Sequence, residues 1–96
     1  MDEWKISEEH KKLMSSIMSD LWALIKASYE IPDKDKDPDA ADHYWSTLAK
    51  WGDALAKKYP GNQLVTNLVM AYLETQNNRA TGTHGWEVTI ITDPNQ

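Results

Sequence analysis

Apolar residues recur at three- and four-residue steps along most of the chain, and this spacing predicts three amphipathic helices. In the first, about residues 7–30, the apolar stripe consists of Met14, Ile17, Met18, Leu21, Ile25 and Tyr29. Ser7 suits the N-cap, because its hydroxyl can accept a hydrogen bond from a backbone N–H of the first turn. Pro32 is expected to end this helix, since the residue before a proline is displaced from the helical region.

The second predicted helix, about residues 39–59, has an apolar stripe rich in tyrosine and tryptophan: Ala41, Tyr44, Trp45, Leu48, Trp51, Leu55 and Tyr59. Asp37 or Asp39 can cap it, with Pro38 near its first turn. Gly52 lies beside the stripe and costs about 1 kcal/mol of helix stability against alanine. It marks either a close helix crossing or a tolerated glycine.

The third predicted helix, about residues 62–77, begins at Asn62 as its N-cap, after the turn at Pro60 and Gly61. Its apolar side chains cover about half of the circumference: Leu64, Val65, Leu68, Val69, Ala71, Tyr72 and Leu73. A helix that packs on one neighbour needs a narrower stripe. We therefore expect this helix to contact two elements, or one element and a partner.

A strand-like segment follows at residues 86–92, where Trp86, Val88 and Ile90 alternate with polar residues. A single strand cannot satisfy its own backbone donors and acceptors. It either folds back over the helices, pairs with its copy in a second chain, or adds to the sheet edge of a partner. The predicted fold is thus mainly α: a three-helix antiparallel bundle with an extended or β-like C-terminal arm.

The chain is expected to form a single domain, residues 1–96, with an acidic inter-helix loop at 31–38 and a loop plus arm at 78–96. Its net charge is −5, and the segment from Glu30 to Asp42 alone carries six acids and two lysines. An acidic balance argues against direct binding of nucleic-acid phosphates.

The acidic loop, with Asp33, Asp35 and Asp37 at alternate positions, superficially resembles the start of a calcium-binding EF-hand loop. Counting from Asp33, the position that needs a glycine is Pro38 and the position that needs a bidentate glutamate is Tyr44. A weaker divalent-cation site would use the carboxylates of Asp33, Asp35, Asp37 and Asp39. The alternative interpretation is a solvated connector whose acids cap the second helix.

Other chemistry has little support in the sequence. The chain has no cysteine, so it has neither disulfides nor thiolate metal ligands, and its three histidines lie on different segments. It contains no nucleophile elbow, phosphate-binding loop or dinucleotide fingerprint. We expect no enzymatic activity, no cofactor and no metal. The charged N-terminus and the short apolar runs predict a cytoplasmic protein that binds no membrane.

The stretch from Leu48 to Leu73 resembles the second helix of a tetratricopeptide repeat running into the next repeat. The matching positions are Trp51, Ala54, Leu55, Tyr59, Pro60, Gly61, Asn62, Leu68, Ala71 and Tyr72. The resemblance implies a peptide-binding helical scaffold and covers about a quarter of the chain. The proline falls one residue late, the Trp-x-x-Leu-Gly pattern is missing upstream, and the chain has room for barely two repeats. These departures favour ordinary helix-turn-helix chemistry, and the family is not assigned.

The leading hypothesis is a non-enzymatic protein–protein interaction module that forms a homodimer or binds another protein through its third helix, its C-terminal arm, or both. The expected contact residues are Met70, Leu73, Trp86, Val88 and Ile90. One alternative is a small acidic regulator or inhibitor of the phage or mobile-element type, which presents its Asp33–Asp42 surface to a basic site. The other is a weak divalent-cation-binding helix-loop-helix.

Overall fold

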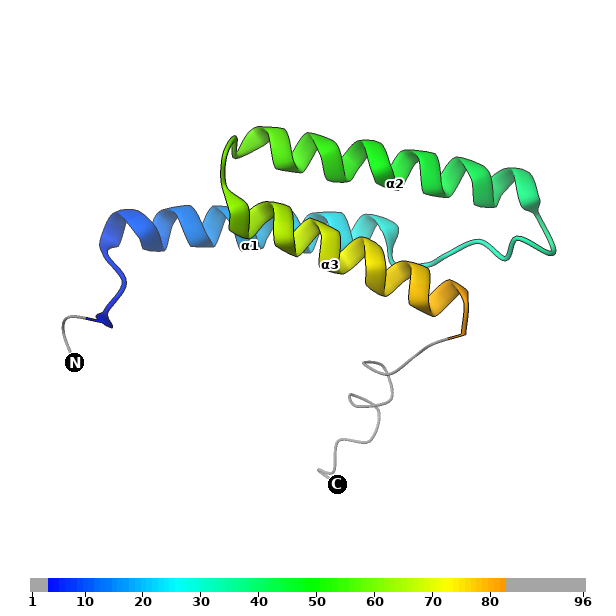
Figure 1. The fold of residues 1–96 in the computed structure, drawn as a ribbon, viewed down its shortest axis with the longest axis horizontal. Coiled ribbons are helices and arrows are strands. Elements are labelled where there is room, and N and C mark those ends of the chain that lie inside the picture. The colour runs from blue at the N-terminus through cyan, green and yellow to red at the C-terminus, as the bar shows by residue number, and fades with distance from the viewer. Residues whose placement is uncertain (1–3, 83–96) are drawn as a thin grey trace, which may run out of the picture.

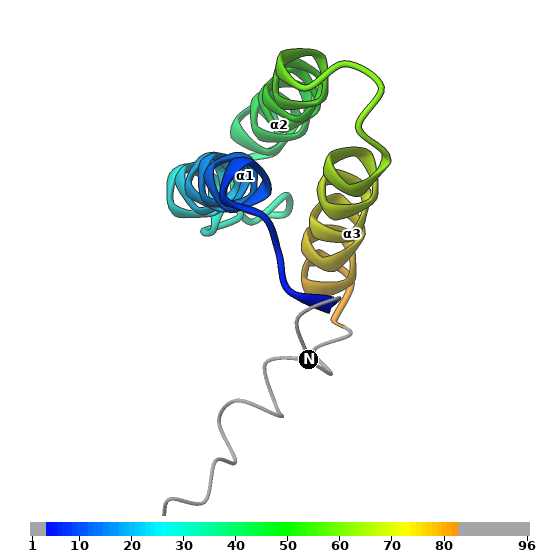
Figure 2. The ribbon, with the colours of Figure 1, turned by 90° about the vertical axis from the view of Figure 1, so that its left-hand side faces the viewer.

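A computed structural model shows the fold and describes residues 4–82. This part of the chain contains three helices, α1 (Glu8–Ser28), α2 (Pro38–Lys58) and α3 (Gln63–Ala80), and no strand. Successive helices run in opposite directions (Figure 1). Viewed nearly end-on, they form a triangle in cross-section (Figure 2). The predicted three-helix antiparallel bundle is confirmed.

The N-caps of α1 and α3 are the predicted side chains, and α2 uses Asp37, one of its two predicted candidates. Ser7 Oγ accepts a hydrogen bond from His10 N at 3.1 Å, and Asp37 Oδ1 accepts one from Ala40 N at 3.0 Å. Asn62 Oδ1 accepts from Val65 N at 3.1 Å. Each bond satisfies a backbone donor that has no partner inside its helix. The three starts were predictable because a cap depends on a few neighbouring residues.

The C-terminal ends differ from the prediction. α1 ends at Ser28, before the predicted Glu30, and α3 continues to Ala80, three residues beyond the predicted Asn77. The extra turn of α3 carries Arg79, whose guanidinium donates to a backbone carbonyl at the end of α1. This tertiary contact outweighs the weak helix propensity of the asparagines there. The predicted arm at 86–92 lies outside the described residues.

The core consists of two apolar clusters. Ile17, Val65 and Val69 form one, and Leu24, Leu48 and Tyr72 form the other. Two half-buried leucines, Leu55 and Leu73, pack against both clusters and join them. α3 contacts both α1 and α2, which confirms the prediction drawn from its wide apolar surface.

The first turns of α1 extend past the connection between α2 and α3 (Figure 1). Accordingly, the first buried residue of α1 is Ile17, nine residues after Glu8. Leu13 and Met18 stay 37% and 44% exposed. Packing therefore stabilises mainly the C-terminal half of α1.

Gly52 marks a close crossing of α2 on α3. A Cβ atom at this position would lie 3.0 Å from Val69 Cγ1 and 3.9 Å from Leu73 Cδ1. Val69 is buried, and its branched side chain has little rotamer freedom in a helix. The close crossing, rather than a merely tolerated glycine, explains this residue.

Gly52→Leu is expected to lower the free energy of unfolding by about 1–3 kcal/mol, because overpacking outweighs the better helix propensity of leucine. Urea denaturation followed by circular dichroism measures the change. Ala49→Leu, at an exposed position of the same helix, is the matched control and should change stability by no more than about 0.5 kcal/mol. Equal effects of the two substitutions would contradict the close crossing.

A polar cluster ties α1 to the end of α2. Asp20 Oδ2 lies 2.8 Å from Lys58 Nζ and accepts a 2.5 Å hydrogen bond from the Tyr59 hydroxyl. The same hydroxyl lies 2.6 Å from Ser16 Oγ. The hydrogen bonds from Lys58 and then Tyr59 hold the pKa of Asp20 below its ordinary value of 3.8. The carboxylate is therefore better stabilised in the folded state than in the unfolded chain.

This pKa shift gives stability a defined dependence on pH. The contribution of Asp20 is fully present above the unfolded pKa and is lost as the pH falls through the lower folded pKa. As the pH falls from above the ordinary pKa of 3.8 through the lower folded pKa, we expect the free energy of unfolding to fall more steeply in the natural protein than in Asp20→Asn. Denaturation at several pH values measures both slopes, and parallel slopes would show that the Asp20 contacts contribute nothing.

Candidate functional site

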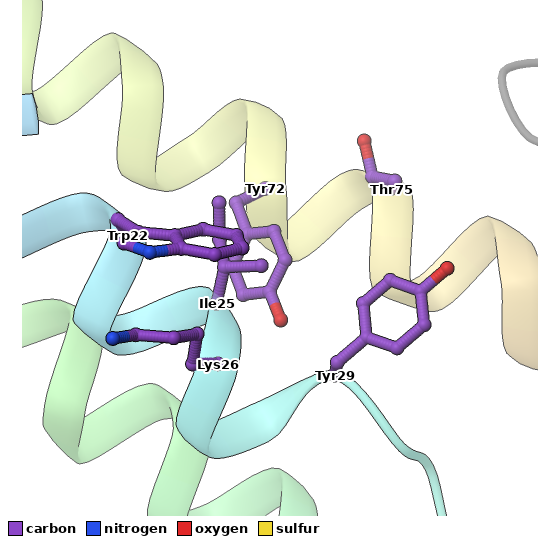
Figure 3. Close-up of a pocket in the computed structure, with 6 residues that line it drawn as sticks. All are labelled: Trp22, Ile25, Lys26, Tyr29, Tyr72 and Thr75. Carbon is purple, nitrogen blue, oxygen red and sulfur yellow. The ribbon is translucent and has the colours of Figure 1, made fainter. Parts of the chain in front are cut away.

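An apolar groove of about 770 Å³ runs between α1 and α3, and no residue of α2 lines it. Its described lining is Trp22, Ile25, Lys26, Tyr29, Tyr72 and Thr75. Figure 3 shows the first three projecting from α1, Tyr29 from the residue that follows this helix, and the last two from α3. α2 packs against both helices on another side of the triangle and leaves this face uncovered (Figure 2).

Helical periodicity explains the groove. On α1, Leu24 and Ser28 point into the core, while Met18, Trp22, Ile25 and Tyr29 recur on the neighbouring flank. On α3 a second flank repeats the same spacing with Leu64, Leu68, Ala71 and Thr75. The two flanks border one surface, because Trp22 and Ile25 of the first and Thr75 of the second line the same groove.

Trp22 is the most unusual residue of the groove. It is 58% exposed, although tryptophan gains more from burial than most residues do. Across the groove, Tyr72 is only 9% exposed and forms part of the floor (Figure 3). A buried floor with an exposed aromatic wall is typical of a binding surface.

The one charged side chain of the described lining, Lys26, is positive. Lys26 Nζ lies 5.5 Å from the centre of the Trp22 ring, and the Arg79 guanidinium stacks 3.9 Å from the centre of the Tyr29 ring. Both arrangements are favourable cation–π contacts. The described lining includes no carboxylate. The described lining is thus apolar, with one cation and no anion.

The floor rests on a buried polar network. Ser28 is 3% exposed and Gln76 is fully buried. The Ser28 hydroxyl donates to Leu24 O at 2.6 Å and lies 2.8 Å from the Tyr72 hydroxyl. The described residues contain no buried side-chain polar atom without a hydrogen-bond partner. The network is therefore satisfied, which is the condition for polar groups to stabilise a core.

Gln76 and Arg79 of α3 cap the end of α1. Gln76 Nε2 donates to Ser28 O at 2.9 Å and to Tyr29 O at 3.0 Å. Arg79 donates to Tyr29 O at 2.6 Å and to Gln76 Oε1 at 2.9 Å. The last carbonyls of a helix lack partners within it, and a following glycine often turns the chain to satisfy them. Here α1 has no such glycine, and α3 supplies the donors.

Tyr44 of α2 completes the network. Its hydroxyl donates to Ser28 O at 2.5 Å and accepts from Gln76 Nε2 at 2.8 Å. Burial raises the pKa of Tyr44 and of Tyr72 above the ordinary value of 10.0. Both phenols are consequently neutral near pH 7 and are able to donate hydrogen bonds.

The predicted contact residues on α3 lie apart from the groove. Met70 is 60% exposed, but the surrounding positions of its outer face are polar: Gln63, Thr66, Asn67, Glu74 and Asn77. Leu73 packs against both core clusters. Trp86, Val88 and Ile90 lie outside the described residues. The structure thus does not bring the predicted set together within residues 4–82.

The acidic segment uses two of its carboxylates locally. Asp33 Oδ1 accepts a hydrogen bond from Asp35 N at 2.8 Å, and Asp37 caps α2. Asp39 lies in the first turn of α2, where a carboxylate suits the helix dipole. Within the described residues no group of three potential ligands is placed to hold a metal ion.

The described fold belongs to the general class of small three-helix antiparallel bundles. No family model, curated protein or solved structure matches the chain. The tetratricopeptide resemblance stays a local similarity of Leu48–Leu73. None of the helices between residues 4 and 82 combines the length and apolar character needed to cross a membrane.

Gln76→Met is expected to lower the free energy of unfolding by about 1–3 kcal/mol, because it removes the hydrogen bonds of Gln76 from the buried network at nearly constant volume. Chemical denaturation measures the loss. Gln63→Met, at an exposed position of α3, is the matched control and should stay within about 0.5 kcal/mol of the natural protein. An unchanged stability in Gln76→Met would show that the cap is dispensable.

Proposed function

We propose that this protein is a non-enzymatic interaction module whose α1–α3 groove binds a peptide segment of a partner protein. The observation that carries the proposal is the groove, which α2 leaves open among residues 4–82, with its exposed Trp22 wall and its buried Tyr72 floor. Aromatic residues at the centre of a patch supply much of the binding energy in protein interfaces.

The chemistry of the groove defines the kind of partner segment. Isoleucine and aromatic side chains offer apolar contact, and Thr75 offers a hydroxyl at the edge. Lys26 adds a cation beside Trp22. The segment that fits best presents large apolar side chains on one face and acidic residues beside them.

Two surfaces of α3 are candidates for partner binding: the flank that borders α1 and the outer face that carries Met70. The distribution of apolar side chains favours the flank that borders α1. Met70 stands alone among polar neighbours on that outer face, whereas the groove is continuous across two helices. A second copy of the chain would be a special case of a partner. Light scattering of the natural protein at micromolar concentration distinguishes self-association from binding to another protein.

Selection of displayed random peptides against the full chain tests the proposal. We expect enriched peptides to combine tryptophan, isoleucine or leucine with aspartate or glutamate. Trp22→Glu should weaken binding of such a peptide by about 30-fold or more, the loss typical of an interface hot spot. Fluorescence anisotropy with the labelled peptide measures the affinity.

Trp51→Glu is the matched control, since Trp51 is 43% exposed and lies outside the lining of the groove. The affinity of Trp51→Glu for the selected peptide should stay within about threefold of that of the natural protein, the range of a contact outside the hot spot. Peptides that bind both variants equally, or a selection that yields no peptide, would overturn the proposed function.

A further inference from the structure

The chain carries a segment that matches the chemistry of the groove. Residues 83–96, which lie beyond the described part, contain Trp86, Val88 and Ile90 at alternating positions. Alternation puts these side chains on one face of an extended segment. The same stretch contains Glu87 and Asp93 and neither lysine nor arginine. It is an apolar, acidic peptide of the kind that the groove favours.

We propose that the segment Trp86–Ile91 occupies the α1–α3 groove of its own chain. The groove then has an internal ligand, and a partner peptide must displace it. This regulatory consequence rests on the proposed function, whereas the occupancy itself does not.

The chain leaves α3 close to the groove. Thr75 lines the groove six residues before the C-cap Thr81, a rise of about 9 Å along the helix. Gly82 has φ +93°, a conformation that glycine adopts readily. This backbone angle is not helical, so the chain departs from the axis of α3 here. Four extended residues span about 13 Å, so Trp86 can reach the level of Thr75 without strain.

The remaining length also fits. From Trp86 to Ile90 an extended segment spans about 13 Å, which corresponds to about two and a half turns of helix. Such a segment runs back along α3 from Thr75 toward Leu68, on the flank that borders α1. Its apolar side chains would cover Trp22 and Ile25.

Charge complementarity favours the same occupant. The described lining contains Lys26 and no carboxylate, while the stretch 83–96 contains two acids, Glu87 within the segment and Asp93 after it, and neither lysine nor arginine. Attraction between unlike charges near a surface adds to the burial of apolar area. Lys26→Glu should therefore weaken the occupancy, and Lys50→Glu, on the exposed side of α2, should not.

The absence of cysteine makes a direct test possible. A nitroxide spin label attached to Thr89→Cys broadens the NMR signals of nearby protons. We expect the Trp22 indole N–H and the Ile25 amide to broaden, while the Trp51 indole N–H stays sharp. The broadening should be independent of protein concentration and should disappear in Val88→Asp/Ile90→Asp.

A mixed sample separates this occupant from the others. One chain carries the label and a second, unlabelled chain carries ¹⁵N for detection. Occupancy within one molecule predicts sharp groove signals in this mixture and broadened groove signals in the sample whose chains carry both the spin label and ¹⁵N. Broadened groove signals in the mixture would show that a second copy fills the groove and would overturn the proposal, as would sharp signals in both samples.

The readout is independent of the proposed function. If the label broadens the groove signals but no peptide binds, the internal ligand stands and the partner-binding function fails. If peptides bind through Trp22 while the label has no effect, the function stands and the internal ligand fails. If both stand, Val88→Asp/Ile90→Asp should bind the selected peptide more tightly than the natural protein.

Discussion

The end of α1 is held by side chains of another helix, and the rest of the structure depends on this contact. Gln76 and Arg79 donate to the carbonyls of Ser28 and Tyr29, which have no partners within α1. Because these carbonyls are strong acceptors in a dry environment, leaving them unpaired would cost about 1–3 kcal/mol. The bonds fix α3 against α1 at one end, while the apolar core aligns the helices further along.

The groove follows from the same contact. The network that caps α1 also bonds the Tyr72 hydroxyl through Ser28, so the floor of the groove is anchored from beneath. α2 contributes Tyr44 to the network from its own side and leaves the opposite flank uncovered. An anchored floor suits binding, since a preorganised surface loses less conformational freedom when a ligand arrives.

Much of the fold could be predicted from the sequence, and the reason is locality. The helix starts could be predicted from the caps Ser7, Asp37 and Asn62, because a cap involves only residues within one turn. The network joins residues up to 50 positions apart, so no local pattern marked Gln76 or Arg79, and Arg79 fell in the predicted loop at 78–96. The groove was missed for the same reason. The equal spacing of two residue sets was a usable signal, but the side of the bundle that α2 leaves uncovered had to be known as well. The sets are Met18, Trp22, Ile25 and Tyr29, and Leu64, Leu68, Ala71 and Thr75.

Native-state hydrogen exchange at the end of α1 tests the central claim most directly. If α3 caps this helix, the amides of Lys26, Ala27 and Ser28 should exchange only through the opening that also exposes the core amides around Val69. Their opening free energies would then equal that of global unfolding and fall with it under denaturant. Exchange of these three amides through a separate, low-energy fraying of the last turn would contradict the account.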